Sequence, residues 1–306
     1  MEQTEGAGAA AKVYTTYRSL LFALAYRMLG SVMDAEDIVQ EAFLAMSEMK
    51  VEDVRHPKAY LCKIVTNRCI DRLRSASKQR EVYVGPWLPE PLVETSHSVV
   101  DEPFSSYMQK ESLSTAYLLL LQQLSWVERA VFLLREVLQY EYDEIAEIVG
   151  KSSTNCRQIF RRAKLAISGI PEDERELAGV NVQQKETTLV EQFVQALASG
   201  NMPQLLSIVK EGAVLYSDGG GKVRAAVRPI VGADRIAAFF FGLQEKQLPE
   251  GNSFAFAPVN GATGVIGYAY GQPYFVLTVE IREEQIASLY LVVNPDKLKH
   301  VVPINS

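Results

Sequence analysis

Apolar residues recur at three- and four-residue steps through most of the first half of the chain, which is the spacing of an α-helix with one buried face. Residues 14–28 follow this spacing, and Gly30 comes where such a helix would end. Asp34 opens a second helix, with Asp37 three residues later in the manner of a capping box. A third helix begins at Pro57, a residue suited to the first turn. The N-terminal region is therefore predicted to be all-helical.

Breaks in this spacing divide the chain into three domains. Residues 81–110 contain four prolines and no regular period, which predicts a linker, and an acid-rich stretch after Pro171 marks a second boundary. Helical spacing resumes between the two breaks. The predicted organisation is a helical domain over 9–80, a linker over 81–110, a helical domain over 111–170, a linker over 171–184 and a third domain over 185–306.

The third domain combines helices with short strands. Two helices, one before and one after Gly200, come first, and an apolar helix over 232–243 follows later. Strand-forming runs separated by short turns predict strands over 212–217, 222–229, 254–259, 264–270, 274–280 and 286–293. This order predicts an α+β domain whose last strands form a curved antiparallel meander.

Composition excludes several classes of protein. Hydrophobic residues make up 48% of the chain, and no apolar run approaches the roughly 18 residues that span a bilayer. The N-terminus is acidic and lacks the basic and apolar blocks of a signal peptide, so we expect a cytoplasmic protein with no membrane partner. The cysteines and histidines stand in no metal-ligand spacing. We therefore expect reduced, buried thiols, no bound metal and no cofactor.

The net charge of −6 argues against general coating of nucleic acid, but the basic residues are concentrated in two places. Residues 55–80 hold eight Lys or Arg against the single acid Asp71, and residues 151–168 hold five basic residues and no acid. Two local basic elements in an acidic protein indicate that only these surfaces contact DNA, and that a second partner binds the acidic surfaces.

The second basic element has the pattern of a helix-turn-helix. Residues 142–149 predict a short helix, Gly150 the turn, and residues 154–167 the second helix. At about 100° per residue, one face of the second helix is apolar, and the opposite face carries Asn155, Arg157, Gln158, Arg161, Arg162 and Lys164. The two nearest the helix start, Arg157 and Gln158, are candidates for base contacts, and the later basic residues are candidates for phosphates. A solvated basic helix on a small bundle is the alternative.

The first basic element lies on the helix that begins at Pro57. An i, i+4 stripe of apolar residues faces a core, and the opposite side carries Tyr60, Lys63, Asn67 and Arg74, flanked by Arg68 and Arg72. An aromatic ring can stack on an unpaired base, while cations follow the strand backbone and an amide reads a base edge. These residues therefore indicate a surface for single-stranded DNA; an ordinary charged outer face is the alternative.

A polar stripe lies on the second predicted helix and consists of Asp37, Gln40, Glu41 and Glu48. A solvated acidic face is the ordinary explanation for such a stripe. Beside a DNA-binding helix, however, it repels phosphate, so a basic protein partner is the better interpretation.

These segments resemble bacterial sigma factors. Their second region is similar to YRSLLFALAYRMLGSVMDAEDIVQEAFLAM (17–46) and HPKAYLCKIVTNRCIDRLRS (56–75), and their fourth region to LSWVERAVFLLREVLQYEYDEIAEIVGKSSTNCRQIFRRAK (124–164). No third region is apparent, as in the compact extracytoplasmic-function group. Trp126 departs from the proline that relatives commonly have at a helix start, and we expect little consequence.

Three shorter motifs extend the resemblance to the SigJ-type subgroup, which carries a SnoaL-like C-terminal extension. They are WLPEP (87–91), DGGGK (218–222) and NPDKL (294–298). The resemblance implies core RNA polymerase and promoter DNA as partners. It assigns the acidic second helix to the polymerase clamp, the third helix and the loop at 51–56 to opening the −10 element, and the helix-turn-helix to the −35 element. Promoter melting of this kind involves no bond chemistry.

The resemblance also predicts the fold class. It implies a multidomain chain with two all-α sigma-factor domains, the second a helix-turn-helix, and an α+β cone-shaped domain of the nuclear-transport-factor-2-like fold. That fold encloses an apolar pocket and hosts cyclases, isomerases and epoxide hydrolases, so an enzyme is one role for the extension.

An enzyme needs a polar group of tuned pKa inside the cone. The domain's one histidine, His300, lies beyond the last predicted strand. The other candidates fall at turns or strand starts, where solvated or structural roles are simpler: Asp218, Asp234, Arg224 and Arg228. A non-enzymatic regulator is therefore the preferred interpretation, and an isomerase or hydrolase is the alternative. An unidentified small-molecule ligand in the pocket is compatible with both.

The regulatory interpretation makes the three motifs a docking surface between the extension and the linker. Docking would set whether the two DNA-binding modules are compact or splayed. The residues are Trp87, Leu88, Pro89, Asp218, Gly219, Gly220, Lys222, Asn294, Pro295, Asp296 and Lys297. A tight turn at 218–222 and a strand end at 294–298 are the simpler explanations. A helix-turn-helix repressor that never binds polymerase is a third interpretation, and the strand-opening face argues against it.

Overall fold

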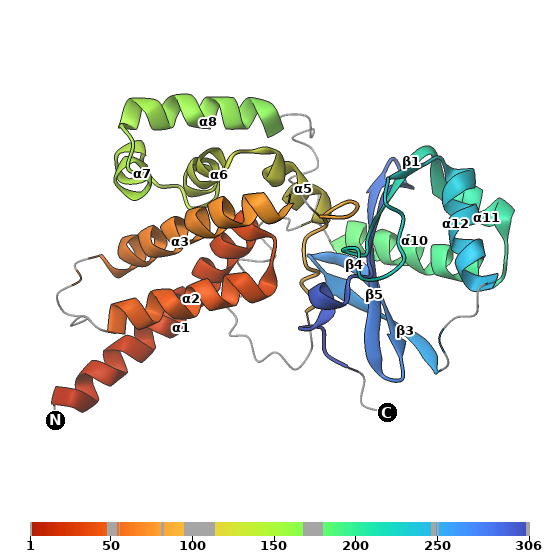
Figure 1. Cartoon of the computed structure of the whole chain (residues 1–306), viewed down its shortest axis with the longest axis horizontal. Helices are drawn as coiled ribbons and strands as arrows, with labels where there is room; N and C mark the ends of the chain where they lie inside the picture. Colours follow the sequence, from red (N-terminus) through yellow and green to blue (C-terminus); the bar gives the residue numbers. More distant parts are fainter. Residues whose placement is uncertain are drawn as a thin grey trace. The chain divides into compact units, whose positions relative to one another are not determined.

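The computed structural model describes residues 2–47, 54, 56–80, 83–94, 114–167, 180–245, 249 and 251–303 (Figure 1). These residues form two compact units. One contains residues 2–80 and 117–167, and the other contains 83–94, 114–116 and 180–303. The predicted polymerase residue Glu48 and most of the loop at 51–56 lie outside the described residues.

The first part of the helical unit consists of α1 (Glu2–Leu29), α2 (Val32–Ser47) and α3 (Pro57–Arg80). After α1, Gly30 takes the left-handed conformation (φ +69°) that favours glycine at a helix end. The predicted inward stripe of α3 is buried, with Leu61, Val65 and Cys69 fully inaccessible. The three helices pack on one another through their apolar faces, which confirms the expected all-helical domain.

The second part of this unit contains α5 (Thr115–Gln123), α6 (Trp126–Phe132), the π-helix η2 (Leu133–Val137), α7 (Tyr142–Val149) and α8 (Ser153–Ile167). Ser125 starts α6 through a capping box with Glu128, and Trp126 takes the first helical position. Gly150 ends α7 in the left-handed conformation, which glycine adopts at no steric cost. The predicted helix-turn-helix is formed by α7 and α8 (Figure 1).

The two helical parts pack together as one body. α3 contacts α6 and α7, and α1 contacts α6. At this junction Arg129 is 3% exposed, and its guanidinium donates to the carbonyl oxygens of Met28, near the end of α1, and of Leu124. Because a buried guanidinium is costly to leave unpaired, these bonds fix how α1 and α6 meet.

The second unit contains a six-stranded sheet and three longer helices among its described residues. The helices are α10 (Val180–Ala198), α11 (Met202–Ile208) and α12 (Ala233–Glu245). The strands are β1 (Val209–Asp218), β2 (Ile230–Val231), β3 (Asn252–Val259), β4 (Ala262–Ala269), β5 (Gln272–Arg282) and β6 (Gln285–Val292), followed by the 3-10 helix η3 (Pro295–Leu298). The strand order is β2-β1-β6-β5-β4-β3, and the predicted α+β class is confirmed.

The structure differs from the sequence-based expectations for this domain at one pairing that was not predicted, one predicted strand and one simpler explanation. The strands β3 to β6 form the expected antiparallel meander, but β1 pairs with β6 in parallel, with Leu215 beside Leu289. Residues 222–229 form no strand, because three glycines turn the chain before them and Pro229 lacks the N–H that strand pairing uses. Residues 294–298 form no strand end, because Asn294 caps the 3-10 helix that follows it.

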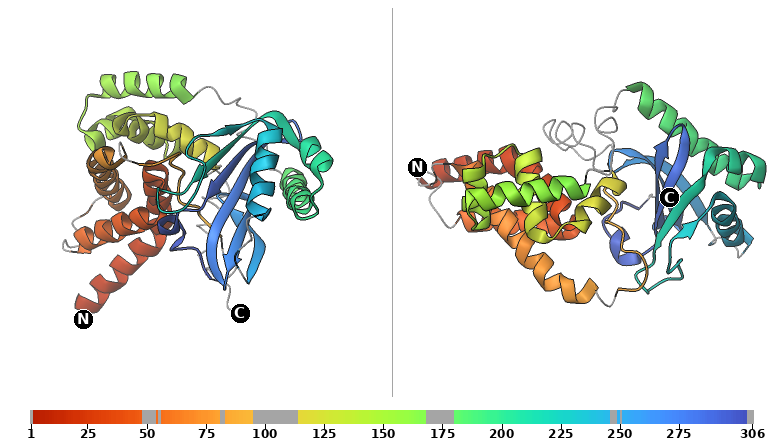
Figure 2. Two further views of the ribbon diagram at one scale, coloured as in Figure 1. Left: turned by 45° about the vertical axis from the view of Figure 1, so that its right-hand side comes forward. Right: turned by 90° about the horizontal axis from the view of Figure 1, so that it is seen from above.

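The two sides of the sheet are covered differently. The helices lie on one side, where Leu215, Leu277 and Leu289 join the main hydrophobic cluster (Figure 2). Side chains alternate along a strand, so Asp218 points to the opposite side. Linker residues 83–94 belong to this unit and meet that opposite side, which leaves the motif residues facing the linker rather than the helices.

Candidate functional site

The outward face of α8 carries all six residues predicted to contact duplex DNA. At the helix start the Ser152 hydroxyl accepts a hydrogen bond from the Asn155 backbone N–H at 3.2 Å. The predicted inward face is buried at Cys156, Ile159 and Ala163. All six predicted residues are exposed: Asn155, Arg157, Gln158, Arg161, Arg162 and Lys164. Donors and cations therefore line one side of a helix, which is what recognition in a major groove requires.

Two of these basic residues have acidic neighbours that the sequence did not indicate. Arg162 lies 3.6 Å from a carboxylate oxygen of Glu128, and Lys164 lies 3.9 Å from one of Glu136. Exposed ion pairs contribute about 0–1 kcal/mol. Both cations can therefore exchange these acids for phosphates at little cost.

The outward side of α3 separates into two groups. The first faces away from the core, with an exposed lysine and arginine and a half-buried tyrosine and asparagine: Lys63, Arg74, Tyr60 and Asn67. The second turns toward α2, where Arg68 forms an ion pair with Glu41 and Arg72 lies 3.3 Å from Asp34. The first group is thus the part of the predicted strand surface that faces away from α2, with Arg74 in an exposed ion pair with Asp71. The second group links the predicted DNA surface to the predicted polymerase surface.

The polar stripe on α2 is accompanied by exposed apolar side chains. Asp37 and Gln40 are exposed, and Glu41 is half-buried beside α3. Met33 and Leu44, which the sequence reasoning missed, are 45% and 65% exposed. Positions 33, 37, 40 and 44 share one helix face. The sequence signal for this surface was therefore that Met33 and Leu44 are apolar but out of phase with the buried stripe of α2. This mixture of acidic, amide and apolar groups suits a protein partner.

Asp218 is the centre of the side of the sheet that meets the linker. Its carboxylate is 0% exposed and accepts hydrogen bonds from the Tyr83 hydroxyl (2.5 Å), the Leu88 N–H (2.8 Å), the Gly220 N–H (3.0 Å) and the Lys297 ammonium (2.7 Å). Of the two simpler roles expected for Asp218, solvated or structural, these bonds and its burial give it the structural one. Burial and the hydrogen bond to Asp218 raise the pKa of Tyr83 well above its usual range, so its hydroxyl stays a donor.

Lys297 closes the same cluster from η3. Its ammonium bonds Asp218 and donates to the Leu88 carbonyl oxygen, so both backbone groups of Leu88 are held. It also lies 3.8 Å from the centre of the Trp87 ring and 5.2 Å from that of Tyr83, where the ring faces attract a cation. The Asp218 and Lys297 side chains are 0% and 7% exposed. Removing one partner of a buried pair costs about 3–5 kcal/mol, so this cluster fixes the linker.

The glycines of the motif at 218–222 are required by packing as well as by the turn. A Cβ at Gly219 would lie 2.6 Å from a backbone oxygen, and one at Gly220 would overlap the Asn294 side chain. Gly220 also has a φ of +58°, which other residues rarely adopt. Lys222 ends the motif in an ion pair with Asp296. The motifs at 218–222 and 294–298 therefore pack directly on each other.

Further contacts hold the linker at other points. The His300 ring bonds the Pro91 carbonyl oxygen at 2.7 Å, and the Asn260 side chain accepts a linker N–H at 3.2 Å. The hydroxyl groups of Thr115 and Thr278 lie 3.1 Å apart, so the start of α5 is tied to β5. The sheet thus holds the chain at residues 83–94 and again at 114–116.

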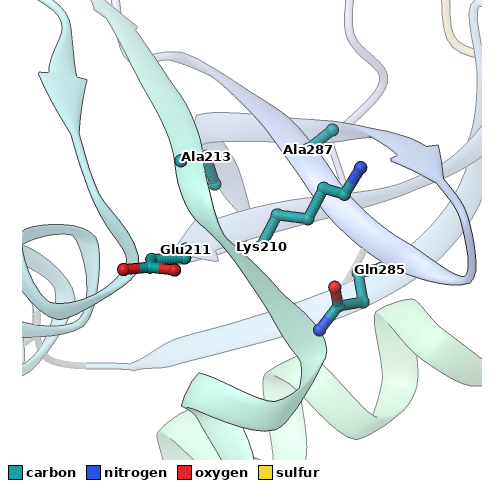
Figure 3. Close-up of a pocket in the computed structure, with 6 residues that line it drawn as sticks. Lys210, Glu211, Ala213, Gln285 and Ala287 are labelled. Carbon is teal, nitrogen blue, oxygen red and sulfur yellow. The ribbon is translucent and has the colours of Figure 1, made fainter.

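An open pocket of about 410 Å³ lies where β1 bulges away from β6 (Figure 3). Its lining consists of Lys210, Glu211, Gly212, Ala213, Gln285 and Ala287. Lys210 is already paired with Glu283 at 3.1 Å. The pocket contains none of the predicted site residues. Its charged lining is one glutamate and one lysine that is already paired, so it favours neither an anionic nor a cationic ligand.

The remaining candidates for catalysis are not gathered at a site. Asp234 lies in the first turn of α12, and Arg224 and Arg228 are exposed. In the part of the chain that the structure describes, no cluster of acidic, histidine and cysteine residues could hold a metal ion. Burial raises the pKa of the Cys62 thiol to about 11. No helix among the described residues has the length and apolar content of a membrane span.

Comparison with known proteins identifies the two helical parts. The family model Sigma-70 region 2 matches residues 13–79, and the model Sigma-70, region 4 matches residues 114–167. The chain is 31% identical over 293 residues to the ECF RNA polymerase sigma factor SigJ of Mycobacterium tuberculosis, which covers 93% of this chain and 91% of that protein. It is 29% identical over 287 residues to the probable ECF RNA polymerase sigma factor SigI of the same species, covering 93% of each chain.

A solved structure extends this similarity to the C-terminal domain. The crystal structure of the Mycobacterium tuberculosis extracytoplasmic function sigma factor SigJ matches with a TM-score of 0.73 and 27% sequence identity. The match covers 94% of this chain and 97% of that one. The similarity therefore includes the sheet and the linker that it holds, as well as the helices.

Proposed function

Because this chain belongs to the extracytoplasmic-function sigma factors, which bind core RNA polymerase and direct promoter-specific initiation, we propose that its C-terminal domain regulates initiation by holding the linker. The observation that carries the proposal is the capture of Leu88 by both of its backbone groups, one bonded to Asp218 and one to Lys297. A linker held in this way has fewer conformations, and the reach between its two DNA-binding modules is restricted. Since the polymerase works on the bacterial chromosome, we place the protein in the cytoplasm.

The DNA contacts follow from the two exposed faces. We propose that α8 reads the −35 element, with base contacts from Arg157 and Gln158 and phosphate contacts from the later basic residues. The outward group of α3 holds an unpaired base of the −10 element, with Tyr60 stacking and Asn67 reading an edge. Arg68 and Arg72 bind acids on α2 in the free protein, so they stabilise the junction of these helices before they meet DNA.

The polymerase contact uses the exposed face of α2. Asp37, Gln40 and Glu41 supply polar groups, and Met33 and Leu44 supply apolar area beside them. Apolar side chains at the centre of a polar rim carry most of the affinity in protein interfaces. The acidic groups then give orientation and association rate toward a basic partner surface.

The C-terminal domain is proposed as a regulator rather than an enzyme. In its described part, most buried polar side chains belong to the linker or to its binding side: Glu90, Thr115, Asp218, Asn260, Thr278, Asn294 and Lys297. Ser217 is the exception among these residues. Acid–base catalysis needs a titratable group at the substrate. The buried charged side chains Glu90, Asp218 and Lys297 belong to the linker or bind it, and the buried Tyr290 hydroxyl is bonded to Glu280. Turnover of a small molecule by the full chain would favour the alternative, an isomerase or hydrolase.

Transcription with core polymerase tests the regulatory proposal. Lys297→Ala and a chain truncated after residue 293 both release Leu88, so both should change promoter-specific transcript yield in the same direction. Combining Lys297→Ala with Asp218→Ala should add little, because the two residues hold one linker segment. The matched control is Lys185→Ala, which removes an exposed lysine paired with Glu284 in the same domain. Unchanged yield from both linker-releasing chains would exclude the proposal.

Trp87 gives a direct readout of linker docking. The chain contains two tryptophans, so a Trp126→Phe background leaves Trp87 as the only emitter. Its ring lies 3.8 Å from the Lys297 ammonium. Lys297→Ala should shift its emission to longer wavelength as the linker becomes solvated, and Lys185→Ala should leave it unchanged. If transcription changes without this shift, Lys297 acts by another route.

A further inference from the structure

The ring of Tyr142, at the start of α7, is close to two arginines from different elements. The Arg135 guanidinium lies 4.8 Å from the centre of the tyrosine ring, and the Arg157 guanidinium lies 5.4 Å from it. The same ring meets Phe160 edge-on, with ring centres 6.2 Å apart. Tyr142 therefore touches the recognition helix at an inward residue and at a residue on its DNA-facing side.

The π-helix before α7 places Arg135 on this ring. In η2 the Leu138 N–H bonds the Leu133 carbonyl oxygen, a five-residue step that widens the helix by one residue. Arg135 then donates to the Tyr140 carbonyl oxygen at 2.8 Å and lies 3.1 Å from Glu141. Arg135 thus has its hydrogen-bond and ion-pair partners within the domain, and its guanidinium stays close to the Tyr142 ring.

Arg157 is held in a different way from the other basic residues of α8. It is exposed, and among the described residues the tyrosine ring is its one identified partner. An aromatic ring attracts the charge of a guanidinium without accepting its N–H groups in the ring plane, so the N–H donors of Arg157 stay available. Arg162 and Lys164, in contrast, direct their charge at carboxylates. Contact with a ring orients the Arg157 donors without occupying them.

We infer that Tyr142 is a positioning residue for promoter specificity: its ring holds the Arg157 guanidinium in the orientation that makes a bidentate contact with a guanine of the −35 element. The inference rests on the proposed role of α8 in −35 recognition. Two parallel N–H donors match the O6 and N7 acceptors of guanine, and a side chain already oriented for them loses less freedom on binding. An arginine without the ring makes the same contact less often and tolerates other bases better.

Transcription by the reconstituted holoenzyme tests the specificity role. On a promoter that the wild-type protein transcribes, each guanine of the −35 element is replaced in turn. Tyr142→Leu should lower the preference for one guanine by about tenfold, and Arg157→Ala should abolish the preference for that same guanine. The double variant should resemble Arg157→Ala alone. Tyr142→Phe, which keeps the ring, should retain the preference. A uniform loss of transcript across all templates with Tyr142→Leu would assign the ring a purely structural role and overturn the inference.

Side-chain NMR tests the positioning itself, with no DNA present. In the full chain, the Nε–H group of Arg157 should be more rigid than that of Arg161, an exposed arginine one turn later on the same helix. Tyr142→Leu should make Arg157 as mobile as Arg161 and leave Arg161 unchanged. Equal mobility of the two arginines in the wild-type chain would overturn the inference, even if the helix-turn-helix reads the −35 element. Rigid Arg157 with no base preference in transcription would instead contradict the proposed −35 role.

Discussion

The role of a single residue in this protein depends more on its partners than on its residue type. The face of α8 could be predicted from the sequence because helix geometry fixes which residues share a side. The acids beside Arg162 and Lys164 could not, because they come from α6 and η2 and depend on how the helices pack. Asp218 follows the same rule: a DGGGK turn normally lies in solvent, and only the approach of the linker and η3 buries it.

Asp218→Asn should destabilise the C-terminal unit by about 3–5 kcal/mol, because it leaves the Lys297 ammonium buried without a counter-ion. Urea unfolding followed by Trp87 emission measures this loss in the Trp126→Phe background. Asp296→Asn is the matched control: its pair with Lys222 is about half exposed, so about 0–1 kcal/mol is expected. Equal losses from the two variants would mean that burial of the Asp218 pair contributes nothing special.

The Cys62 thiol should make the helical unit less stable at high pH. Burial is the main cause that raises its pKa from 9.0 to about 11. The folded state keeps the proton that the unfolded state loses, so this contribution is complete below pH 9 and is lost as pH rises through 11. The loss is about 1.4 kcal/mol per pH unit between these values. Cys62→Ala should flatten the fall in unfolding free energy measured between pH 9 and 11; an unchanged slope would show that other groups cause it.

At the scale of helices and strands, the sequence predicts whether an element forms better than it predicts which strands pair. Five helices of the helical unit, α1, α2, α3, α7 and α8, could be predicted from apolar spacing, caps and turn residues, because these signals are local. The parallel pairing of β1 with β6 depends on where the meander returns, and no local pattern specifies it. The π-helix at 133–137 also escapes prediction, since the leucines around it fit an α-helical period equally well.

The exposed face of α2 should bind polymerase through its apolar residues. Leu44→Ser should weaken binding to core polymerase by roughly 1–2 kcal/mol, about 5- to 30-fold, because Leu44 is 65% exposed beside a polar stripe. Thermal unfolding should be almost unchanged, since surface positions contribute little to stability. Val231→Ser, an exposed apolar change on β2, is the matched control in a competition assay for core polymerase. If Val231→Ser weakened binding to core polymerase by the same factor, the exposed face of α2 would not be a specific binding surface.

At the scale of the molecule, the division into units differs from the division by sequence. The two helical parts that a proline-rich linker separates form one compact unit, whereas the linker residues 83–94 and the start of α5 belong with the C-terminal sheet. The sequence suggested three domains, because composition indicates where the chain is irregular. It does not indicate what an irregular segment packs against. The WLPEP motif was the one local sign that this linker has a binding partner.

Arg129→Ala should loosen the helical unit and leave the other unit intact. Two carbonyl oxygens lose a charged donor, each worth about 1.5–3 kcal/mol. Amide hydrogen exchange should therefore rise together at the end of α1 and in α6, while rates in β1 and β6 stay unchanged. A rise in the sheet as well would show that the two units unfold as one.

The composition of the C-terminal unit has a consequence for engineering. It is assembled from three stretches of chain, residues 83–94, 114–116 and 180–303. A chimaera that fuses only the last stretch to another sigma factor would carry the Asp218–Lys297 pair without the Tyr83 hydroxyl and the Leu88 backbone that cover and bond it, and such a graft should misfold or aggregate. A transferable regulatory domain has to include the linker of this chain, because the linker that the domain is proposed to control is also part of the domain's own structure.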